Sequence, residues 1–172
     1  MKNMPAFRLL LLVLCFLAAT QTFAQDKKAP ASPPATATGK IGKATATVVY
    51  SSPAVKGRPI WGQLVPYGQV WRSGANEATT ITFDQPVTVE GQPLAAGTYS
   101  LFTIPTEKQW TMIFNKTAKQ WGAFKYDDKQ DALRVTVTPQ KAITPAERLM
   151  YDVTPTGLTL RWENMRVPVA IK

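Results

Sequence analysis

Apolar and polar residues alternate along most of the chain that follows Lys43. In the first such segment, Ala44, Ala46, Val48 and Tyr50 fall on one face and threonines fall on the other. The same period of two recurs in residues 81–83, 87–89, 110–114, 133–137, 149–153, 158–162 and 167–171. Strict alternation is typical of β-strands that bury one face. The pattern therefore predicts a series of short strands and no amphipathic helix.

Residues 99–104 are apolar on both faces, which predicts a central strand. Turn-forming residues at 90–93, 96–97, 105–108, 155–157 and 163–166 separate the strands as hairpin connections do. We therefore predict a single all-β domain over residues 43–172. Its expected fold is a jelly-roll-like antiparallel β-sandwich of about nine or ten short strands, with a barrel as the alternative.

Residues 52–78 show neither a strand nor a helix period, and loops of this length are uncommon in compact domains. The segment is nevertheless rich in large apolar residues, among them Ile60, Trp61, Val65 and Trp71. Such residues do not stay solvated, so disorder is disfavoured. We expect one long packed loop that folds back on the sandwich.

The start of the chain has the pattern of an export signal. Lys2 and Arg8 precede an uncharged apolar run, and Thr22 and Ala24 place small residues where signal peptidase cleaves. The run is shorter than the roughly 20 apolar residues that span a bilayer. We predict a signal peptide over residues 1–24, no transmembrane anchor after cleavage, and a periplasmic or extracellular location. Residues 25–42, dominated by Pro, Ala, Thr and Ser, are expected to form a disordered linker.

The amino-acid composition excludes several kinds of catalytic and metal-binding site. The chain has no histidine, which excludes Ser-His-Asp catalysis and His-ligated metals, and its one cysteine, Cys15, lies in the apolar run. No small residue directly precedes Cys15, so a lipoprotein cysteine is disfavoured. The formal net charge of +9 comes from scattered lysines and arginines, a pattern of a basic soluble surface and not of a nucleic-acid site.

Four hydrogen-bonding side chains fall together at the end of the long loop: Arg72, Ser73, Asn76 and Glu77. Arg72 has the geometry to bind a carboxylate or phosphate, and Glu77 could act as a general acid or base. The structural alternative is that Arg72 and Glu77 pair with each other and fasten the loop. We treat the four residues as the candidate ligand-binding site.

Trp121 is added to this candidate site as an exposed aromatic platform for a glycan or another small molecule. Residues 126–131 hold the one acidic cluster, but its spacing differs from that of a calcium loop and Lys129 interrupts it, so a solvated turn is favoured. The sequence thus predicts neither a metal nor a cofactor.

Three stretches of the chain resemble an exported bacterial family known as domain of unknown function 2911. They are GRPIWGQLVPYGQVWRSGANEATTITF at residues 57–83, LAAGTYSLFTIP at 94–105 and WTMIFNK at 110–116. The resemblance runs from about Lys43 to Ile171, with Ala95 where the family more often has proline. It implies a secreted or periplasmic β-rich protein and carries no activity or catalytic residue with it.

Two classes of function remain from the sequence. The favoured one is a non-catalytic ligand-binding or cell-envelope module in which the long loop builds the contact surface. The alternative is a carboxylate-dependent hydrolase or lyase acting on polysaccharide or peptide, for which Glu77 and Asp127 are the plausible pair. Glycosidase chemistry needs two carboxyl groups about 5 to 10 Å apart across the scissile bond.

Overall fold

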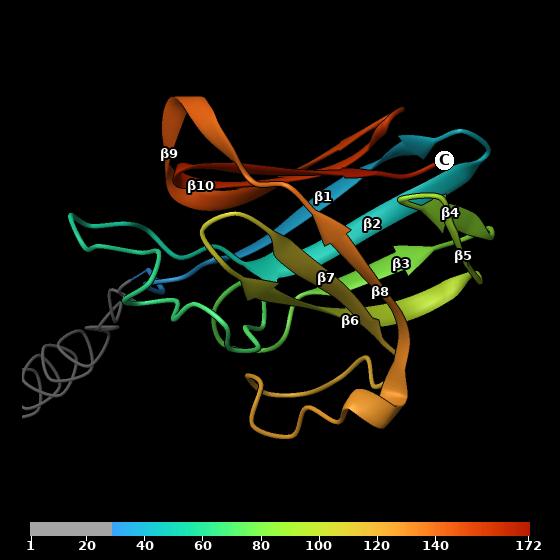
Figure 1. The fold of residues 1–172 in the computed structure, drawn as a ribbon, viewed down its shortest axis with the longest axis horizontal. Coiled ribbons are helices and arrows are strands. Elements are labelled where there is room, and N and C mark those ends of the chain that lie inside the picture. The colour runs from blue at the N-terminus through green and yellow to red at the C-terminus, as the bar shows by residue number, and fades with distance from the viewer. Residues whose placement is uncertain (1–28) are drawn as a thin grey trace, which may run out of the picture.

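The computed structural model describes residues 29–172, which form ten strands and one short 3₁₀ helix (Figure 1). The predicted signal peptide lies outside these residues. In chain order the elements are β1 (Pro34–Ile41), β2 (Ala44–Ser51), β3 (Thr80–Phe83), β4 (Val87–Val89), β5 (Gln92–Leu94), β6 (Gly97–Pro105), β7 (Trp110–Asn115), η1 (Asp128–Gln130), β8 (Asp131–Val137), β9 (Gln140–Thr154) and β10 (Gly157–Ala170).

The strands form three antiparallel sheets. The main sheet has six strands in the order β1-β2-β3-β6-β7-β8, and the β9–β10 and β4–β5 hairpins form the other two. The long β9–β10 hairpin lies over one face of the main sheet (Figure 1). The all-β antiparallel prediction is therefore confirmed. The division into sheets of six, two and two strands does not show the finer prediction of a jelly-roll-like sandwich.

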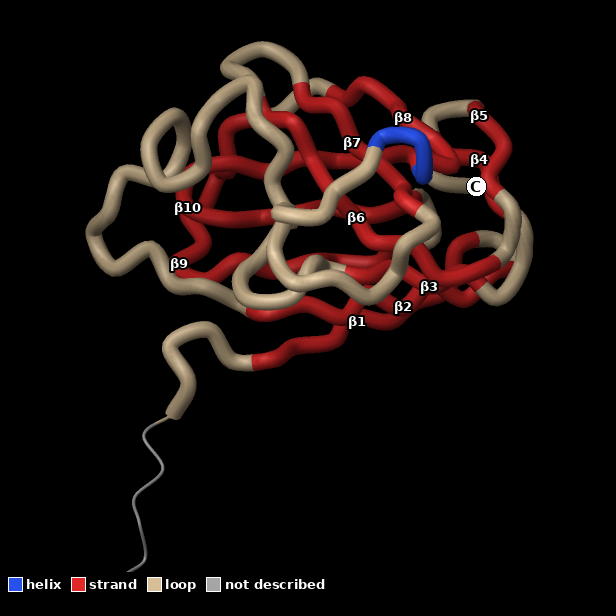
Figure 2. Tube along the Cα trace, turned by 90° about the horizontal axis from the view of Figure 1, so that it is seen from below, coloured by secondary structure: helices blue, strands red, loops and turns tan. Residues whose placement is uncertain are grey.

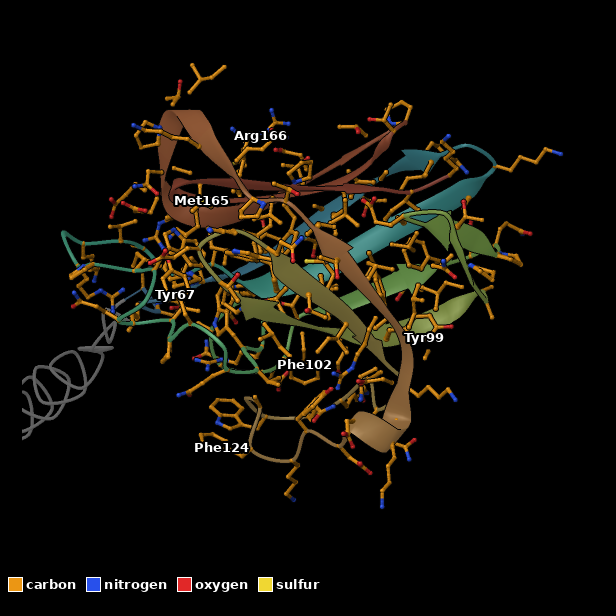
Figure 3. The ribbon with its side chains drawn as sticks, viewed as in Figure 1. Tyr67, Tyr99, Phe102, Phe124, Met165 and Arg166 are labelled. Atoms are coloured by element: carbon orange, nitrogen blue, oxygen red, sulfur yellow. The ribbon has the colours of Figure 1, made fainter. Side chains whose placement is uncertain are left out.

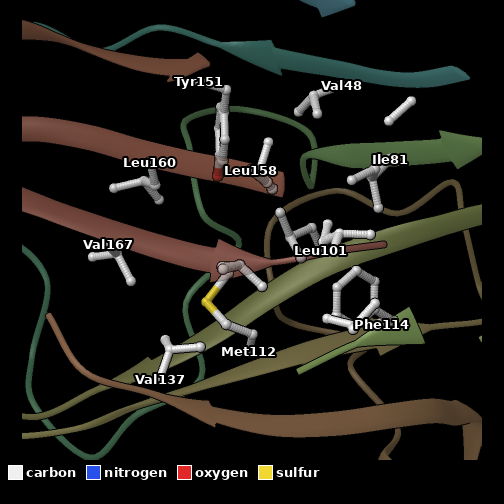
Figure 4. Packing of buried hydrophobic residues seen from close by; sticks show 14 of the residues in the cluster. Val48, Ile81, Leu101, Met112, Phe114, Val137, Tyr151, Leu158, Leu160 and Val167 are labelled. Atoms are coloured by element: carbon white, nitrogen blue, oxygen red, sulfur yellow. The ribbon is translucent and has the colours of Figure 1, made fainter. Parts of the chain in front are cut away.

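The main core lies between the six-stranded sheet and the β9–β10 hairpin. Figure 4 shows Val48, Leu101 and Met112 of the sheet facing Tyr151 and Leu160 of the hairpin. Each of these side chains is buried, as the alternation of apolar residues predicts. Burial of such side chains contributes about 1.5 to 3 kcal/mol each, so this interface is the main source of stability.

Strand β6 is central, as its two apolar faces predict. It lies between β3 and β7, and Leu101 points into the main core while Phe102 points to the other face. There Phe102 packs with Ala78 and Ile113 in a second, smaller cluster. Long loops run over this side of the sheet and cover the cluster (Figure 2).

The prediction of a disordered linker over residues 25–42 is wrong for Pro34–Ile41. This segment forms strand β1, which pairs with all eight residues of β2. Small residues there reflect close packing and not solvation. A Cβ atom at Gly39 would lie 2.8 Å from the carbonyl oxygen of Val153 in β9, so β1 passes directly beneath the hairpin. A strand of Ala, Thr and Gly fits this narrow space, and its pairing with β2 supplies the backbone hydrogen bonds.

The expected turn at residues 163–166 is also wrong. Strand β10 continues through this segment, and its pairing with β9 shifts register on both sides of Glu163. The backbone of Glu163 has a φ of 54°, in the left-handed region. Residues 163–166 therefore do not form a hairpin turn. They form an irregularity in the pairing that bends the long strand β10.

Candidate functional site

The loop between β2 and β3 is fixed to both layers of the domain. Trp71 and Thr103 of β6 exchange two backbone hydrogen bonds, of 2.8 and 2.9 Å. At the other end of the loop, the Val55 amide donates to the Glu147 carbonyl of β9 at 2.8 Å. Ile60 and Val65 are buried between these anchors. The loop is packed, as its apolar content predicts.

Four tryptophans meet where this loop closes the end of the core. The ring of Trp61 lies 5.8 Å from Trp71, 4.9 Å from Trp110 and 5.8 Å from Trp162, in edge-to-face geometry each time. Trp71 stacks on Trp162 at 5.9 Å. The indole nitrogens of Trp61, Trp110 and Trp162 are buried without a hydrogen-bond partner. The cluster thus combines a large apolar area with three unpaired donors.

A cleft of about 440 Å³ opens beside this cluster. Trp71, Trp162 and Leu64 contribute apolar surface, while Lys56, Arg58 and Arg72 contribute three basic side chains. Ser32 and Asn76 add polar groups. The lining is completed by small or apolar residues: Ala31, Pro53, Ala54, Val65, Gly74 and Ala75. Among residues 29–172, no Asp or Glu side chain lines the cleft. Its electrostatic character is therefore positive, and its polar groups are mainly donors.

Arg72 is half-buried in this cleft and is not paired with Glu77. The two ion pairs of residues 29–172 join Arg134 to Asp131 and Arg161 to Asp152. The Nε atom of Arg72 is buried without a hydrogen-bond partner, and burial lowers the pKa of the guanidinium. The pairing that the sequence left open is thus not formed. Arg72 remains charged because an arginine pKa lies far above neutrality.

Arg58 is held in the cleft by the loop itself. Its Nε atom donates to the Val55 carbonyl at 3.0 Å, and a terminal nitrogen donates to the Ala54 carbonyl. Glu147 lies outside the lining and accepts the backbone N–H of Lys56 at 2.9 Å. The sequence gives no signal for Lys56 and Arg58, because each is one of many scattered cations. Only the fold of the loop brings them to Arg72.

Ser73, one of the predicted ligand-binding residues, is enclosed by the fold. It is fully buried with a φ of 55°, and its hydroxyl donates to Thr103 Oγ1 at 3.2 Å. Its carbonyl oxygen accepts from the hydroxyls of Tyr151 at 2.7 Å and Thr79 at 2.9 Å. Ser73 therefore connects the loop to β6 and β9 and presents no group to a ligand.

Asn76 lines the cleft and also fastens its rim. Its side-chain nitrogen donates to Ser51 Oγ at 3.2 Å and to the Ser32 carbonyl at 3.5 Å. The backbone of Asn76 is left-handed, with a φ of 59°. After this turn the chain changes direction, so the next residue, Glu77, faces a different part of the surface.

Glu77 and Trp121 share a second cleft, of about 510 Å³. Their backbones form an isolated antiparallel bridge, next to a hydrogen bond of 2.9 Å from the Ala78 amide to the Gln120 carbonyl. Trp121 is 62% exposed. Glu77 is the one carboxylate in the described lining of this cleft. The five predicted site residues thus divide between two clefts and one buried position.

Asp127, which the sequence suggests as a catalytic partner of Glu77, caps a short helix in the structure. Its carboxylate accepts the backbone N–H of Lys129 at 3.0 Å and caps η1. The Asp131 carboxylate accepts hydrogen bonds from Asn115, Tyr126 and Arg134 at 2.6 to 2.8 Å. Burial and the hydrogen bond to Asp131 raise the pKa of Tyr126 to about 12. Within residues 29–172 no three His, Cys, Asp or Glu side chains are grouped as metal ligands would be.

Comparison with known proteins gives a family and no function. The chain matches no curated protein and no solved structure. In the part of the chain that the structure describes, no helix has the length and apolar character needed to cross a bilayer. The family model described as a protein of unknown function, DUF2911, matches residues 32–171, which includes β1 and all later strands. The chain therefore belongs to the DUF2911 family.

Proposed function

We propose that this protein is an exported, non-catalytic binding module whose loop cleft takes a small anionic ligand. The observation that carries the proposal is the lining of the cleft, which contains Lys56, Arg58 and Arg72. Among residues 29–172, no Asp or Glu lines the cleft. A carboxylate or phosphate group meets the donor geometry of a guanidinium particularly well. The export part of the proposal rests on the sequence pattern of residues 1–24.

Arg72 supplies the strongest support. A buried donor without a partner costs about 1 to 3 kcal/mol, so each such group calls for an explanation, and a ligand beside it is one of them. The Nε atom of Arg72 is such a donor, and the indole nitrogen of Trp162, another lining residue, is a second. A bound oxyanion would pair with the Arg72 guanidinium and neutralise part of the local positive charge.

The apolar wall indicates the rest of the ligand. Trp71, Trp162 and Leu64 line the cleft beside the three cations. A volume of about 440 Å³ lies within the range of small-molecule sites. The geometry therefore favours an amphipathic anion, with an aromatic or aliphatic group against the tryptophans and an acidic group toward Arg72. The hairpin and the main sheet would form the two layers of a sandwich that holds this cleft at one end.

Intrinsic fluorescence provides a direct test, because Trp71 and Trp162 line the cleft. Titration with benzoate and phenyl phosphate should change the emission, whereas benzyl alcohol, which lacks the charge, should bind about tenfold more weakly or not at all. Affinity should fall with added salt. Calorimetry with the same three compounds gives the stoichiometry, which should be one.

Arg72→Gln should weaken anion binding about tenfold or more, because charge-assisted hydrogen bonds contribute about 1.5 to 3 kcal/mol. Arg166→Gln is the matched control, since it removes the same charge from β10, outside this cleft. Equal affinity for benzyl alcohol and benzoate would contradict the proposal. So would an equal loss of affinity in the two variants.

A further inference from the structure

The loop that connects β7 to η1, residues 116–127, carries two exposed aromatic side chains. Trp121 is 62% exposed and Phe124 is 87% exposed, although most aromatic residues of the domain are buried. Figure 3 shows Phe124 on the outer side of this loop, away from the sheet. Exposed large apolar side chains that lie close together indicate a surface that contacts something else.

The loop does not need these two side chains to fold. Ala123 and Tyr126 of the same loop point inward and pack on the cluster of Ala78, Phe102 and Ile113. The rings of Tyr126 and Phe102 lie 5.0 Å apart. The fold of the loop is thus accounted for by its inward residues, and the outward aromatics remain without a partner.

The base of the loop is fixed by hydrogen bonds. Ser100 Oγ donates to the Thr117 carbonyl at 2.6 Å, and Asn115 Nδ2 donates to the Asp127 carbonyl at 2.9 Å. The Gly122 amide donates to the Asn76 carbonyl at 3.1 Å. These contacts hold both ends and the middle of the loop on the domain. The aromatic pair is therefore presented on a fixed support, which lowers the entropy cost of binding.

Four lysines surround the aromatic pair along the chain, at positions 116, 119, 125 and 129, and each of them is exposed. Lys119 and Lys125 line a groove of about 360 Å³ together with Trp121 and Phe124. The acidic groups nearby are Asp127, Asp128 and Asp131, after the aromatic pair, and Glu77, in the adjoining cleft. Of these, Asp131 is paired with Arg134. The groove itself has no carboxylate among its described lining residues.

From these observations we propose that residues 116–127 form a membrane-contact loop that binds the surface of an anionic bilayer. Trp121 and Phe124 would enter the interfacial region, where aromatic side chains are favoured, and the lysines would face the anionic headgroups. Each lysine near such a surface contributes roughly a fivefold increase in binding, which corresponds to about 1 kcal/mol. With two aromatics and a few lysines, the contact is reversible.

A neutral glycan fits the loop less well. Sugar recognition needs hydrogen-bonding groups beside the aromatic face, and Gln120 is the uncharged amide side chain in the groove lining. Its Nε2 atom already donates to the Thr117 carbonyl at 2.8 Å, and its Oε1 atom is buried. Thr117 adds one hydroxyl to the groove lining, and the other exposed polar groups beside the aromatics are lysines, whose charge complements phosphate better than neutral hydroxyls.

A probe at the loop tests the proposal locally. In the full chain with Cys15→Ser, Phe124→Cys is labelled with the environment-sensitive fluorophore NBD, and Lys108→Cys, in the exposed turn at the opposite end of β7, is the control site. Vesicles of phosphatidylcholine with phosphatidylglycerol should shift the emission at position 124 to the blue and leave position 108 unchanged. Vesicles of phosphatidylcholine alone should have little effect at either site. An equal response to both vesicles, or none at position 124, overturns the proposal.

Charge reversal separates this loop from other segments of the chain. Lys119→Glu with Lys125→Glu should reduce the response at position 124 about tenfold or more on anionic vesicles. Lys43→Glu with Lys141→Glu makes the same change in net charge on other elements and should preserve the response. Equal loss in both pairs overturns the proposal, as does quenching of Trp121 by neutral polysaccharide at concentrations that leave vesicle binding unaffected.

Discussion

The hydroxyl of Tyr151 donates a hydrogen bond of 2.7 Å to the carbonyl oxygen of Ser73, and both residues are buried. This contact joins the β9–β10 hairpin to the β2–β3 loop, which lines the cleft that we propose binds an anion. Ser73 lies directly after Arg72 in the chain, so the hairpin fixes the backbone from which the Arg72 side chain extends. The stability of the core and the geometry of the cleft are therefore coupled through this pair.

Tyr151→Phe should lower the free energy of unfolding by about 1 kcal/mol, the usual net value of a neutral hydrogen bond. The loss is limited because the Ser73 carbonyl keeps its hydrogen bond from Thr79 Oγ1. Urea denaturation measures the change, with Tyr126→Phe as a control that removes a hydroxyl bonded to Asp131 at a distance from the cleft. A loss above about 3 kcal/mol would mean that the pair has a larger role than one hydrogen bond.

Stability should fall at alkaline pH. Burial raises the pKa of Tyr151 far above its ordinary value of 10.0, and that of Tyr126 is raised to about 12. Above about pH 10 the tyrosines of the unfolded chain lose protons that the folded chain keeps, so the unfolded state gains stability with rising pH. Thermal melts between neutral pH and pH 11 test this. Tyr151→Phe should make the alkaline decline shallower, and an unchanged slope would contradict the assignment.

Trp162→Ala should destabilise the domain by about 3 to 5 kcal/mol, as expected when a buried aromatic site is emptied. Trp162 is 1% exposed and contacts Trp61 and Trp71. The matched control is Trp121→Ala, whose side chain is largely exposed and whose loss should change stability by less than about 1 kcal/mol. Chemical denaturation compares the two variants, and a similar loss in both would contradict the described burial.

Gly39→Ala should destabilise by about 1 to 3 kcal/mol, the range for overpacking a closely packed site. The added methyl group would lie 2.8 Å from the Val153 carbonyl oxygen, a backbone atom that cannot move without shifting β9. Thr36→Ala, on the exposed side of β1, is the control and should be nearly neutral. Hydrogen exchange should also show protected amides in Pro34–Ile41. Rapid exchange throughout this segment would favour the linker expected from the sequence.

Arg72→Met should leave the free energy of unfolding unchanged or raise it by up to about 1 kcal/mol. The guanidinium is half-buried, has no ion partner among the described residues and keeps one donor unpaired, so its removal relieves a desolvation cost. Urea denaturation measures the effect without ligand. A clear loss of stability would indicate that Arg72 fastens the loop and would weaken its assignment to ligand binding.

Much of the fold was predictable because alternation is a local property. The inward residues of β2, β7 and β10, such as Val48, Met112 and Leu160, are buried as their period of two requires. The two apolar faces of β6 likewise predicted a central strand. In each case the residue's own position relative to its neighbours in the chain determines which face it occupies.

The candidate site was predicted only in part, because its members are brought together by distant segments. Arg72 and Asn76 do share a cleft, but Ser73 is buried, and Glu77 lines another cleft together with Trp121. The left-handed backbone at Asn76 separates neighbours in sequence onto different surfaces. Asparagine tolerates the left-handed conformation, but it also occurs in many other loop conformations, so the residue type alone does not identify that turn.

The sequence by itself determined the all-β class, the inward face of most strands, the packed character of the long loop and the membership of its family. Tertiary structure decided that Pro34–Ile41 is a strand, that Glu163 bends β10, and that Lys56 and Arg58 join Arg72. The physical reason is the distance along the chain between the residues that interact. Burial of one face depends on residues two positions apart, whereas strand pairing, close packing and the meeting of three cations depend on contacts between segments that the chain separates.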